Sequence, residues 1–560
     1  MSKTRKKRMY GFGCVRFVLI AAAVVMLMGI CNTAAAFQIP TGDEDVGIRW
    51  DNTFRYNYGV RVHNPDSAII LNPNMDDGDR NFNKGTVTNR LDILSEFDFV
   101  YMKTYGVRFS GAFWYDQRYH DPMGNDSVLT SNHLENGQSA LGFSNATKKY
   151  HRGPDGELLD AFAFGKFDLG PVPLNIKAGR HTVYWGESLM LGGAINGISY
   201  SQMPIDAAKG YATPGTEAKE LFRPLFNISA SAQLTNTFSI SGQYFLQWES
   251  YRFPEAGSYL GSGDMILKGG ESLIVVPGIF SFRHGSDVEP NGRKDWGVAA
   301  QWSPEWLGGK IGLYYRKFSD KLPAVHINLF TGQYFAAYAD GIDLYGVSLA
   351  KQILGVSVGF EYSMRHNMPL VGDAPMIGPY PGMLPAPPSE GDTFGVRGDT
   401  QHALINCMGL LGKTPLFNSA VWIAEVTYSR WDKVTQGEQY FKGRDGYDQL
   451  DRVSKDAVGA SVSFTPTWYQ VFPGMDLSMP LSYSRGLSGN AAFTFGDQKN
   501  GANLGVGLSL DVFQKYSFAL AYTKYYGDYD TDATGAMSLN TGSAGLSDRD
   551  WVSFTFKFTL

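Results

Sequence analysis

The sequence of 560 residues predicts an all-β fold. Specifically, it predicts a transmembrane antiparallel up-and-down β-barrel of about 18 strands, with about 16 strands as the alternative. Three observations support this prediction. Apolar and polar residues alternate with a period of two in many stretches, the connections between these stretches are short and long in turn, and the alternation continues to the C-terminus.

Residues 1–36 have the features of a secretory signal peptide. Basic residues open this segment, an apolar stretch runs from Phe17 to Ile30, and Ala34-Ala35-Ala36 supplies a cleavage site of small residues. A membrane anchor is the alternative, but the apolar stretch is shorter than the ~20 residues that a spanning helix needs. We therefore expect a signal peptide over residues 1–36 and an outer-membrane β-barrel over residues 37–560.

Composition and charge exclude several other classes of protein. After the leader, no uncharged apolar run is long enough for a spanning helix, and an aromatic content of 14% is too high for a disordered chain. Six of the 49 basic residues and none of the 54 acidic residues lie in the leader, so the mature chain has a formal net charge of −11. This balance gives no support to nucleic-acid binding. Cys407 alone follows the leader, so we expect no intrachain disulfide.

The period-two alternation is clearest in residues 48–62, where apolar residues such as Trp50 and Phe54 alternate with mostly polar ones. A sandwich would bury the apolar face in a dry core. The charge-dense opposite faces and the aromatic strand ends instead favour a barrel with lipid outside and a polar lumen. The predicted strands are 47–62, 87–101, 106–118, 158–168, 174–184, 225–234, 238–249, 296–302, 310–318, 343–351, 355–365, 400–411, 419–430, 457–468, 477–485, 503–512, 516–526 and 550–560.

The connections between these strands alternate in length. Short connections such as 103–105 and 513–515 follow every second strand, and the others run from 16 residues (486–501) to 46 residues (250–295). Bacterial outer-membrane barrels alternate short periplasmic turns with long extracellular loops in this way, and they have an even number of strands. The strands 158–168 and 174–184 alternate poorly, so we assign no faces to them.

The last ten residues, 551–560, carry a large apolar side chain at every second position up to Leu560. This segment resembles the terminal β-signal that the outer-membrane insertion machinery recognises, although its usual final Phe is Leu here. We therefore expect the insertion machinery and outer-membrane lipids as partners, and the outer membrane of a Gram-negative bacterium as the location.

Several motifs resemble those of a known family. They are Gly179-Arg180-His181-Thr182-Val183-Tyr184-Trp185-Gly186-Glu187-Ser188, the glycine-rich run 192–198, and the segments 78–82, 89–92 and 214–222. Together they are similar to the proteobacterial outer-membrane family of domain of unknown function 1302, over essentially the whole mature chain. The resemblance implies an outer-membrane channel, or the outer component of a transport route, for a hydrophobic or lipid-like compound. It also implies a periplasmic lipid carrier and an inner-membrane transporter of hydrophobic compounds as partners.

Three alternative functions remain open: a general small-solute porin, a barrel-embedded hydrolase and an adhesive structural barrel. A hydrolase needs a nucleophile, a base and an orienting group in one place, and the chain has no G-x-S-x-G and no H-E-x-x-H motif. His181 near Glu187 and Ser188 is the one cluster that fits such a site, but a strand-end histidine in the wall is the simpler interpretation. We therefore expect no enzyme, no cofactor and no metal.

Charged residues on the predicted inward faces are the candidate pore lining. They either guide anions as a basic ladder or neutralise one another and keep the wall wet. The candidates are Arg49, Arg55, Arg90, Asp92, Glu96, Arg108, Asp116, Glu249, Arg316, Glu361, Arg365 and Glu425.

Three loops are candidates for function. The connection 185–224 either folds into the lumen as a constriction or packs outside the mouth, and the proline-rich loop 366–399 is a lid, a receptor surface or inert decoration. The acid-rich loop 72–85 fails the EF-hand spacing, because Asp77 stands where Gly is required, so we expect a solvated outer loop. The candidate constriction residues are Trp185, Glu187, Asp206, Lys209, Glu217 and Glu220.

Overall fold

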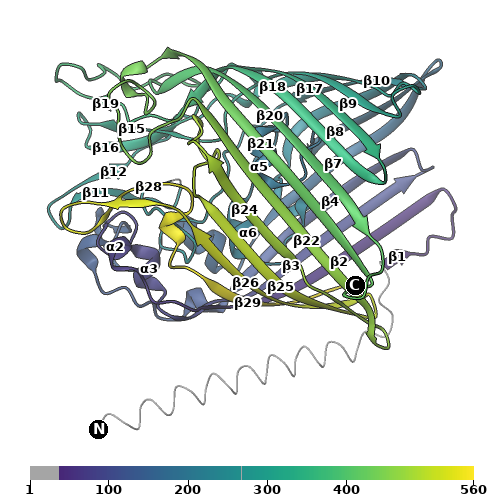
Figure 1. Ribbon diagram of the computed structural model, residues 1–560, viewed down its shortest axis with the longest axis horizontal. Helices are drawn as coiled ribbons and strands as arrows, with labels where there is room; N and C mark the ends of the chain where they lie inside the picture. The colour runs from purple at the N-terminus through teal and green to yellow at the C-terminus, as the bar shows by residue number, and fades with distance from the viewer. Residues whose placement is uncertain (1–36, 267) are drawn as a thin grey trace, which may run out of the picture.

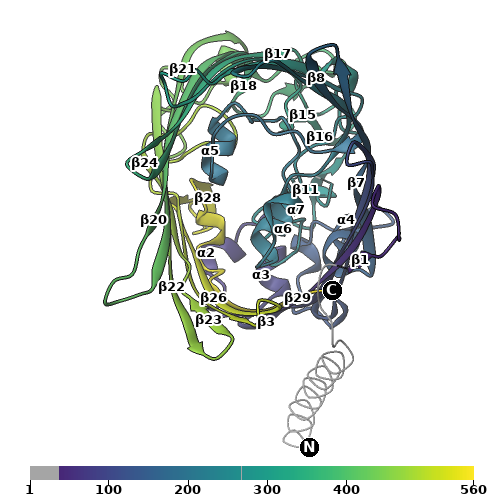
Figure 2. The ribbon, with the colours of Figure 1, turned by 90° about the vertical axis from the view of Figure 1, so that its right-hand side faces the viewer.

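The computed structural model describes residues 37–266 and 268–560, so the predicted signal peptide lies outside the described residues. One large antiparallel sheet closes on itself as a barrel, seen from the side in Figure 1 and along its axis in Figure 2. Closure occurs where the last strand, β29 (Trp551–Thr559), pairs with both β26 (Tyr516–Tyr526) and β2 (Val46–Arg61).

The remaining strands of the wall follow one another in chain order. They are β3 (Gly85–Tyr101), β4 (Tyr105–Asp116), β7 (Asp155–Leu169), β8 (Val172–His181), β9 (Leu225–Thr235), β10 (Phe238–Phe245), β13 (Trp296–Trp302), β14 (Gly309–Phe318), β17 (Ile342–Ile353), β18 (Val356–Leu370), β20 (Val396–Leu411), β21 (Ser419–Gln436), β22 (Asp456–Phe472), β23 (Met475–Ser478), β24 (Leu481–Ser488) and β25 (Ala502–Val512).

The barrel has 18 strand positions, as predicted, although the sheet contains 20 strands. Strands β23 and β24 form one position, because both pair with β22 and β25 and only Met479 and Pro480 separate them. The short β1 (Phe37–Ile39) pairs with β2 beyond the end of β29 and so continues the same position. Each predicted strand range coincides with one of these positions, and the alternative of 16 strands is wrong.

The register confirms the predicted faces of the first strands. Trp50 of β2 lies opposite Phe97 of β3, which in turn lies opposite Phe109 of β4, and both Trp50 and Phe109 are nearly half exposed on the outer wall. Arg55 lies opposite Asp92 on the inner face. The wall therefore turns its apolar side chains to lipid and its charges to the lumen.

The poor alternation of β7 and β8 has two local causes. The pairing of β4 with β7 shifts by one residue after Phe109, and a β-bulge of this kind moves the following side chains to the other face. In β8, Gly179 has a φ of 124°, and a Cβ there would lie 2.4 Å from the carbonyl oxygen of Ala161. Only glycine fits this position, where the strand is irregular.

Short turns and long connections alternate around the barrel, as predicted. Examples of short turns are 236–237 and 354–355, at the end of the barrel that also holds the C-terminus in Figure 1. This architecture is that of a barrel in the outer membrane of a Gram-negative bacterium, with the short turns in the periplasm. None of the helices in residues 37–266 and 268–560 has the length and apolar composition needed to cross a membrane.

The long connections carry the helices and several small sheets. The helices are α2 (Ser67–Ile70), α3 (Asp77–Asn81), α4 (Asn145–Thr147), α5 (Leu191–Asn196), α6 (Ala207–Ala212) and α7 (Ala218–Leu221). The strands are β5 (Leu134–Glu135), β6 (Gln138–Ser139), β11 (Ser272–Val276), β12 (Phe280–His284), β15 (Ala324–Asn328), β16 (Gln333–Ala337), β19 (Met376–Ile377), β27 (Tyr529–Thr531) and β28 (Met537–Asn540).

The proline-rich loop is shorter than predicted, because β18 extends to Leu370 and β20 begins at Val396. Its short strand β19 pairs with β15 at the edge of a five-stranded sheet built from three extracellular loops. Ile377 of β19 is fully buried in a cluster with Phe335 and Ala337. The loop is thus packed onto its neighbours.

The prediction of a solvated acid-rich loop at 72–85 is wrong. Asp76, Asp77 and Asp79 are all buried. The reason is that each carboxylate has partners from distant loops. The carboxylate of Asp79, for example, forms an ion pair of 3.1 Å with Arg549, and Asp77 accepts a hydrogen bond of 2.9 Å from the backbone N–H of Asn132. Charge pairing and backbone donors allow carboxylates to be buried in this way.

Candidate functional site

The connection between β8 and β9, residues 182–224, lies inside the barrel. We call it the lumenal segment. It contains α5, α6 and α7, which Figure 2 shows within the ring of strands. Ile198 and Tyr200 of this segment are fully buried, in a cluster with wall residues such as Phe318 and Leu344. The predicted constriction loop therefore occupies the lumen.

Two wall carboxylates hold the first part of the lumenal segment. Glu361 of β18 accepts hydrogen bonds from the backbone N–H groups of Glu187, Ser188 (2.9 Å) and Ile198 (2.6 Å). Glu425 of β21 accepts them from residues at the start of α5, Leu189 (2.9 Å) and Gly193 (3.0 Å). Both carboxylates are almost completely buried. The hydrogen bond to Gly193 satisfies an N–H group at the start of α5 that would otherwise lack a partner, and the others fix the backbone on both sides of the helix.

Two wall guanidinium groups hold the other end of α5 and the residues after it. Arg365 of β18 donates to the carbonyl oxygens of Ile195, Asn196 and Gly197 at 2.7 to 3.1 Å. Its guanidinium also lies 4.2 Å from the centre of the Tyr200 ring. Glu425 at the N-terminal end of α5 and Arg365 at its C-terminal end suit the polarity of the helix, because a carboxylate stabilises the N-terminal end and a cation the C-terminal end.

Arg316 of β14 continues this pattern one step along the segment. Its guanidinium donates to the carbonyl oxygens of Ile198 (2.7 Å) and Tyr200 (2.8 Å). The Tyr200 hydroxyl donates at 2.9 Å to Asp320, which lies in the loop after β14. Side chains from three wall strands thus fix the backbone of residues 187–200 within the lumen.

The glycine-rich run of the segment has a steric explanation. A Cβ at Gly193 would lie 2.3 Å from a carboxylate oxygen of Glu425, and a Cβ at Gly197 would lie 2.7 Å from one of Glu361. Gly192, in contrast, has room for a Cβ, whose nearest neighbour would be 3.8 Å away. Gly193 and Gly197 therefore permit the close approach of backbone and carboxylate on which the hydrogen bonds depend.

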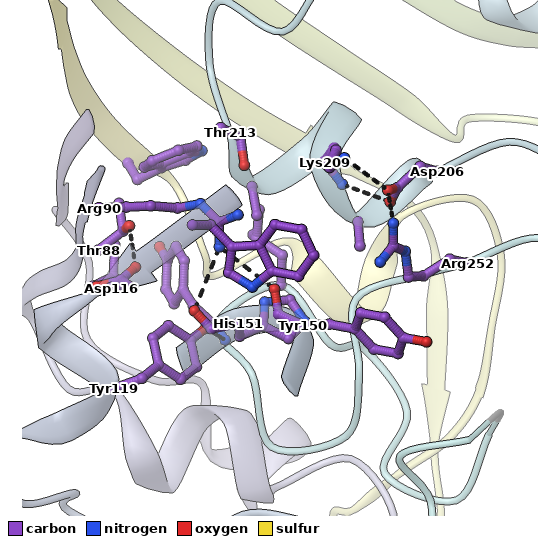
Figure 3. A pocket seen from close by; sticks show the side chains of 17 residues that line it. Thr88, Arg90, Asp116, Tyr119, Tyr150, His151, Asp206, Lys209, Thr213 and Arg252 are labelled. Atoms are coloured by element: carbon purple, nitrogen blue, oxygen red, sulfur yellow. Dashed lines mark hydrogen bonds and ion pairs between the residues drawn. The ribbon is translucent and has the colours of Figure 1, made fainter. Parts of the chain in front are cut away.

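The second part of the segment joins a compact ionic cluster, part of which Figure 3 shows. Lys209 of α6 donates at 2.6 Å to Glu157 of β7, and Arg252 binds both Glu157 (3.0 Å) and Asp206. Burial lowers the pKa of Arg252, but the carboxylates of Asp206 and Glu157 outweigh this effect and raise it overall. Arg252 therefore keeps its charge, and the cluster ties α6 to the wall and to the loop 246–295.

A small cavity adjoins this cluster. Its volume is about 30 Å³, and its lining combines the cations Arg90, Lys209 and Arg252 with the rings of Trp114 and Tyr150. The Arg90 guanidinium and the Lys209 ammonium lie 5.7 Å and 5.6 Å from the centre of the Trp114 ring, and the Arg252 guanidinium lies 4.4 Å from that of Tyr150; Figure 3 labels Tyr150 and the three cations. A space of this size holds about two water molecules, so the cavity is too small for an organic ligand.

The last part of the segment reaches the strands at which the barrel closes. Glu220 of α7 forms an ion pair of 2.8 Å with Arg55 of β2, and Glu217 forms one of 3.1 Å with Lys557 of β29. Lys219 contacts Glu96 of β3 at 2.5 Å. The lumenal segment is therefore fixed to two different parts of the wall.

The other predicted pore-lining residues pair with their neighbours. Arg90 binds Asp92 at 2.8 Å, Arg108 binds Glu96, Asp98 and Asp160, and Arg49 binds Asp51. Asp116 accepts a hydrogen bond from Thr88, and Glu249 binds Arg223 and Arg180 near the mouth. Of the predicted constriction residues, Trp185 packs near Tyr314 and Glu187 binds Lys310 at 2.9 Å.

Sequence reasoning missed Glu157, Arg252 and Tyr200. The first lies on β7, to which no faces were assigned, and the other two lie in loops, where no period indicates direction. For Tyr200, a large aromatic residue within a long polar connection is a signal of burial that could have been used.

The one predicted cluster of hydrolase type does not assemble. The His181 ring bonds to the Ser229 hydroxyl (2.7 Å) and to the Gly179 carbonyl, while Glu187 pairs with Lys310 and Ser188 contacts Tyr184. Over the described residues, no group of three or more His, Cys, Asp or Glu side chains is arranged to hold a metal ion.

Comparisons with known proteins complete the description. Solved structures similar to this chain include OccK1 (OpdK) of Pseudomonas aeruginosa, with 11% identity, a TM-score of 0.39 and coverage of 92% of this chain and 98% of that one. Another is OccAB4 of Acinetobacter baumannii, with 9% identity, a TM-score of 0.41 and coverage of 92% and 98%. Among curated proteins, none matches this chain. A family model described as "Protein of unknown function (DUF1302)" matches residues 17–560, and the chain therefore belongs to the DUF1302 family.

Proposed function

We propose that the protein is a passive outer-membrane channel, not an enzyme, in which the lumenal segment forms the constriction. The observation that carries this proposal is the attachment of the segment to the wall by buried charges, above all Glu361, Arg365 and Glu425. A wide barrel leaves an aqueous channel unless something narrows it. Over the described residues, the lumenal segment has no hydrophobic core of its own, and the wall holds it at many points. We therefore expect it to narrow the lumen without blocking it.

The cargo that this geometry supports best is a small polar solute. On the side of α7, charged side chains inside the barrel remain in contact with water: Arg49 is 58% exposed, Lys219 47%, Glu217 44% and Lys557 31%. We call these four residues the charged strip. Three of the four are cations, and each of these pairs with a carboxylate, of Asp51, Glu96 or Glu217. The paired charges keep a path wet without a strong preference for anions or cations.

Ion conductance tests this proposal. Purified protein in planar bilayers is expected to pass ions, and liposomes that contain it are expected to swell in small sugars and not in large ones. The change Lys219→Glu should shift the reversal potential in a salt gradient towards cation preference. Lys413→Glu, on a periplasmic turn outside the lumen, is the matched control and should leave the reversal potential unchanged. Protein that never conducts would refute the channel.

A route for a hydrophobic or lipid-like compound is the second candidate, which the family resemblance implies. It is favoured by the apolar tip of the β11–β12 hairpin in the extracellular loops, where Val275 is 52%, Ile279 83% and Phe280 48% exposed. On this route, a periplasmic lipid carrier and an inner-membrane transporter would be partners. Lipid analysis of the outer membrane and the medium, with and without deletion of the protein, separates the candidates. Redistribution of a hydrophobic compound would favour this second route.

A further inference from the structure

A groove of about 580 Å³ opens on the barrel wall where β24 and β26 end and β25 begins. Its lining includes the side chains of Tyr483 and Arg485 from β24, and of Lys524 and Tyr526 from β26. Asn500, Asp528 and Ser547, from the connections at the same end of the barrel, add polar groups to the lining. Neither the lumenal segment nor the charged strip contributes to this groove.

The groove faces the membrane and not the lumen. Tyr525 is only 2% exposed and packs against Tyr211 of the lumenal segment, so its side chain points inward. Because side chains alternate along a strand, those of Lys524 and Tyr526 point outward. On the same face of β26, Leu520 is 50% exposed on the outer wall, which confirms the direction.

The groove also lies at the extracellular edge of the apolar band. Strand β26 starts after a short periplasmic turn, 513–515, and ends where the long connection 527–550 begins. Its outward side chains are apolar or aromatic from Tyr516 to Tyr522, and the first outward charge is Lys524. This position corresponds to the aromatic girdle, at the level of the lipid headgroups of the outer leaflet.

The two cations of the groove have spare donors. The guanidinium of Arg485 donates to the side-chain oxygen of Asn500 at 2.9 Å, and over residues 37–266 and 268–560 this is its one hydrogen bond. Asn500 in turn donates to Asp528 at 2.8 Å, so it separates the guanidinium of Arg485 from the carboxylate of Asp528. The ammonium of Lys524 contacts the buried carboxylate of Asp550 at 3.1 Å. A guanidinium has five N–H donors and an ammonium three, so most remain available.

We propose that this groove binds the phosphorylated headgroup of a lipid of the outer leaflet. A cation on the lipid-facing wall is unfavourable unless it is paired. Lys524 has Asp550 as a partner, but over residues 37–266 and 268–560 Arg485 forms no ion pair, and an anionic headgroup is the partner that the membrane supplies at this level. Arg485 can bind two phosphate oxygens at once, while Lys524 adds a point charge. The rings of Tyr483 and Tyr526 flank the cations and provide apolar surface for the body of the lipid.

Binding to the purified full-length protein in detergent tests the proposal. The probes are lipid A, a bisphosphorylated glucosamine disaccharide lipid, the same lipid after removal of its phosphates, and inorganic phosphate. We expect lipid A to raise the melting temperature and to remain bound in native mass spectrometry. The dephosphorylated lipid should do neither, and inorganic phosphate should act only weakly, since it lacks the apolar body.

Variants connect this binding to the groove. The double change Arg485→Ala with Lys524→Ala should weaken lipid A binding at least about tenfold, because both charged partners of the phosphate are lost. Arg485→Gln keeps most of the side-chain volume and serves as a second variant if the double variant folds poorly. Lys317→Ala is the matched control. Lys317 follows the inward-pointing Arg316, so it points outward, and it lies near the extracellular end of β14, which is distant from the groove along the wall.

Three outcomes would overturn the proposal. The first is equal binding of lipid A by the double variant and the natural protein. The second is equal binding of the phosphorylated and dephosphorylated lipids, which would indicate that only apolar contact matters. The third is stabilisation by inorganic phosphate that equals that by lipid A, which would indicate a site for free phosphate.

Discussion

Replacement of Glu361 by Ala is the most direct test of how the lumenal segment is held. The carboxylate accepts hydrogen bonds from the backbone N–H groups of Glu187, Ser188 and Ile198, on both sides of α5. The change to Ala removes the acceptor for all three and leaves a cavity between the wall and the segment. The fold of the barrel itself should persist, because the strand pairing of β18 involves only its backbone.

The size of the effect follows from these three contacts. A hydrogen bond to a charged group contributes about 1.5–3 kcal/mol, so the three together contribute roughly 4.5–9 kcal/mol. Water that enters the space will restore part of this, and Glu425 still holds the start of α5. We therefore expect the free energy that holds the segment against the wall to fall by at least about 3 kcal/mol. The fraction of molecules with a released segment should then be more than about 100-fold larger than in the natural protein.

Single-channel recording in planar bilayers measures this release. The Glu361→Ala variant should show a larger mean conductance, more frequent steps between conductance levels and a higher size limit for solutes in liposome swelling. Each of these effects follows if the segment leaves the lumen in part of the molecules.

The control is Asp98→Ala, which also removes a carboxylate from the inner wall. Asp98 pairs at 3.1 Å with Arg108, which is a residue of the wall and not of the lumenal segment. This variant should change ion selectivity slightly and leave the conductance steps unchanged. If Glu361→Ala and the natural protein gave the same conductance, noise and size limit, the role of Glu361 in holding the constriction would be refuted.

Three further changes test the same structure. Arg365→Met should raise the conductance and its fluctuations in bilayer recordings, because three carbonyl oxygens at the end of α5 lose their donor, whereas an unchanged trace would contradict this. Gly193→Ala should have a similar effect, since its Cβ would lie 2.3 Å from Glu425, while Gly192→Ala should resemble the natural protein in the same recordings. Burial raises the pKa of Glu255, in the connection 246–295, from 4.5 to about 7. The folded protein therefore holds a proton that the unfolded chain releases above about pH 4.5, so stability falls by up to about 3 kcal/mol as the pH rises through 7. Glu255→Gln should remove this part of the pH dependence of the melting temperature, and a curve parallel to that of the natural protein would show that another group is responsible.

The strands could be predicted from the sequence because their physical cause is local. A strand between lipid and water must alternate apolar and polar residues, so Trp50, Phe54 and their neighbours indicate the fold without knowledge of any distant contact. The alternation fails in β7 and β8, where a bulge and Gly179 interrupt the strands. Such irregularities depend on the neighbouring strand and leave no local period.

The partners of the charged residues could not be predicted in the same way. Alternation places Glu361 on the inner face, but its partner Glu187 is separated from it by 174 residues in the sequence. The buried acids of the loop 72–85 show the same limit, because Asp79 owes its burial to Arg549 near the other end of the chain. The residues around a charged residue in the sequence therefore predict which face of the wall it lies on, but not which residue it pairs with.

The glycine-rich motif links these two levels. Gly193 and Gly197 mark positions where the backbone must approach another group closely. The structure identifies these groups as two carboxylates of the barrel wall, those of Glu425 and Glu361. The same segment then reaches Arg55 and Lys557, which lie directly opposite each other on β2 and β29. These are the first and last long strands, so Glu217 and Glu220 of the lumenal segment bridge the point of closure. Docking of the constriction therefore requires the closed barrel and, in turn, stabilises the closure.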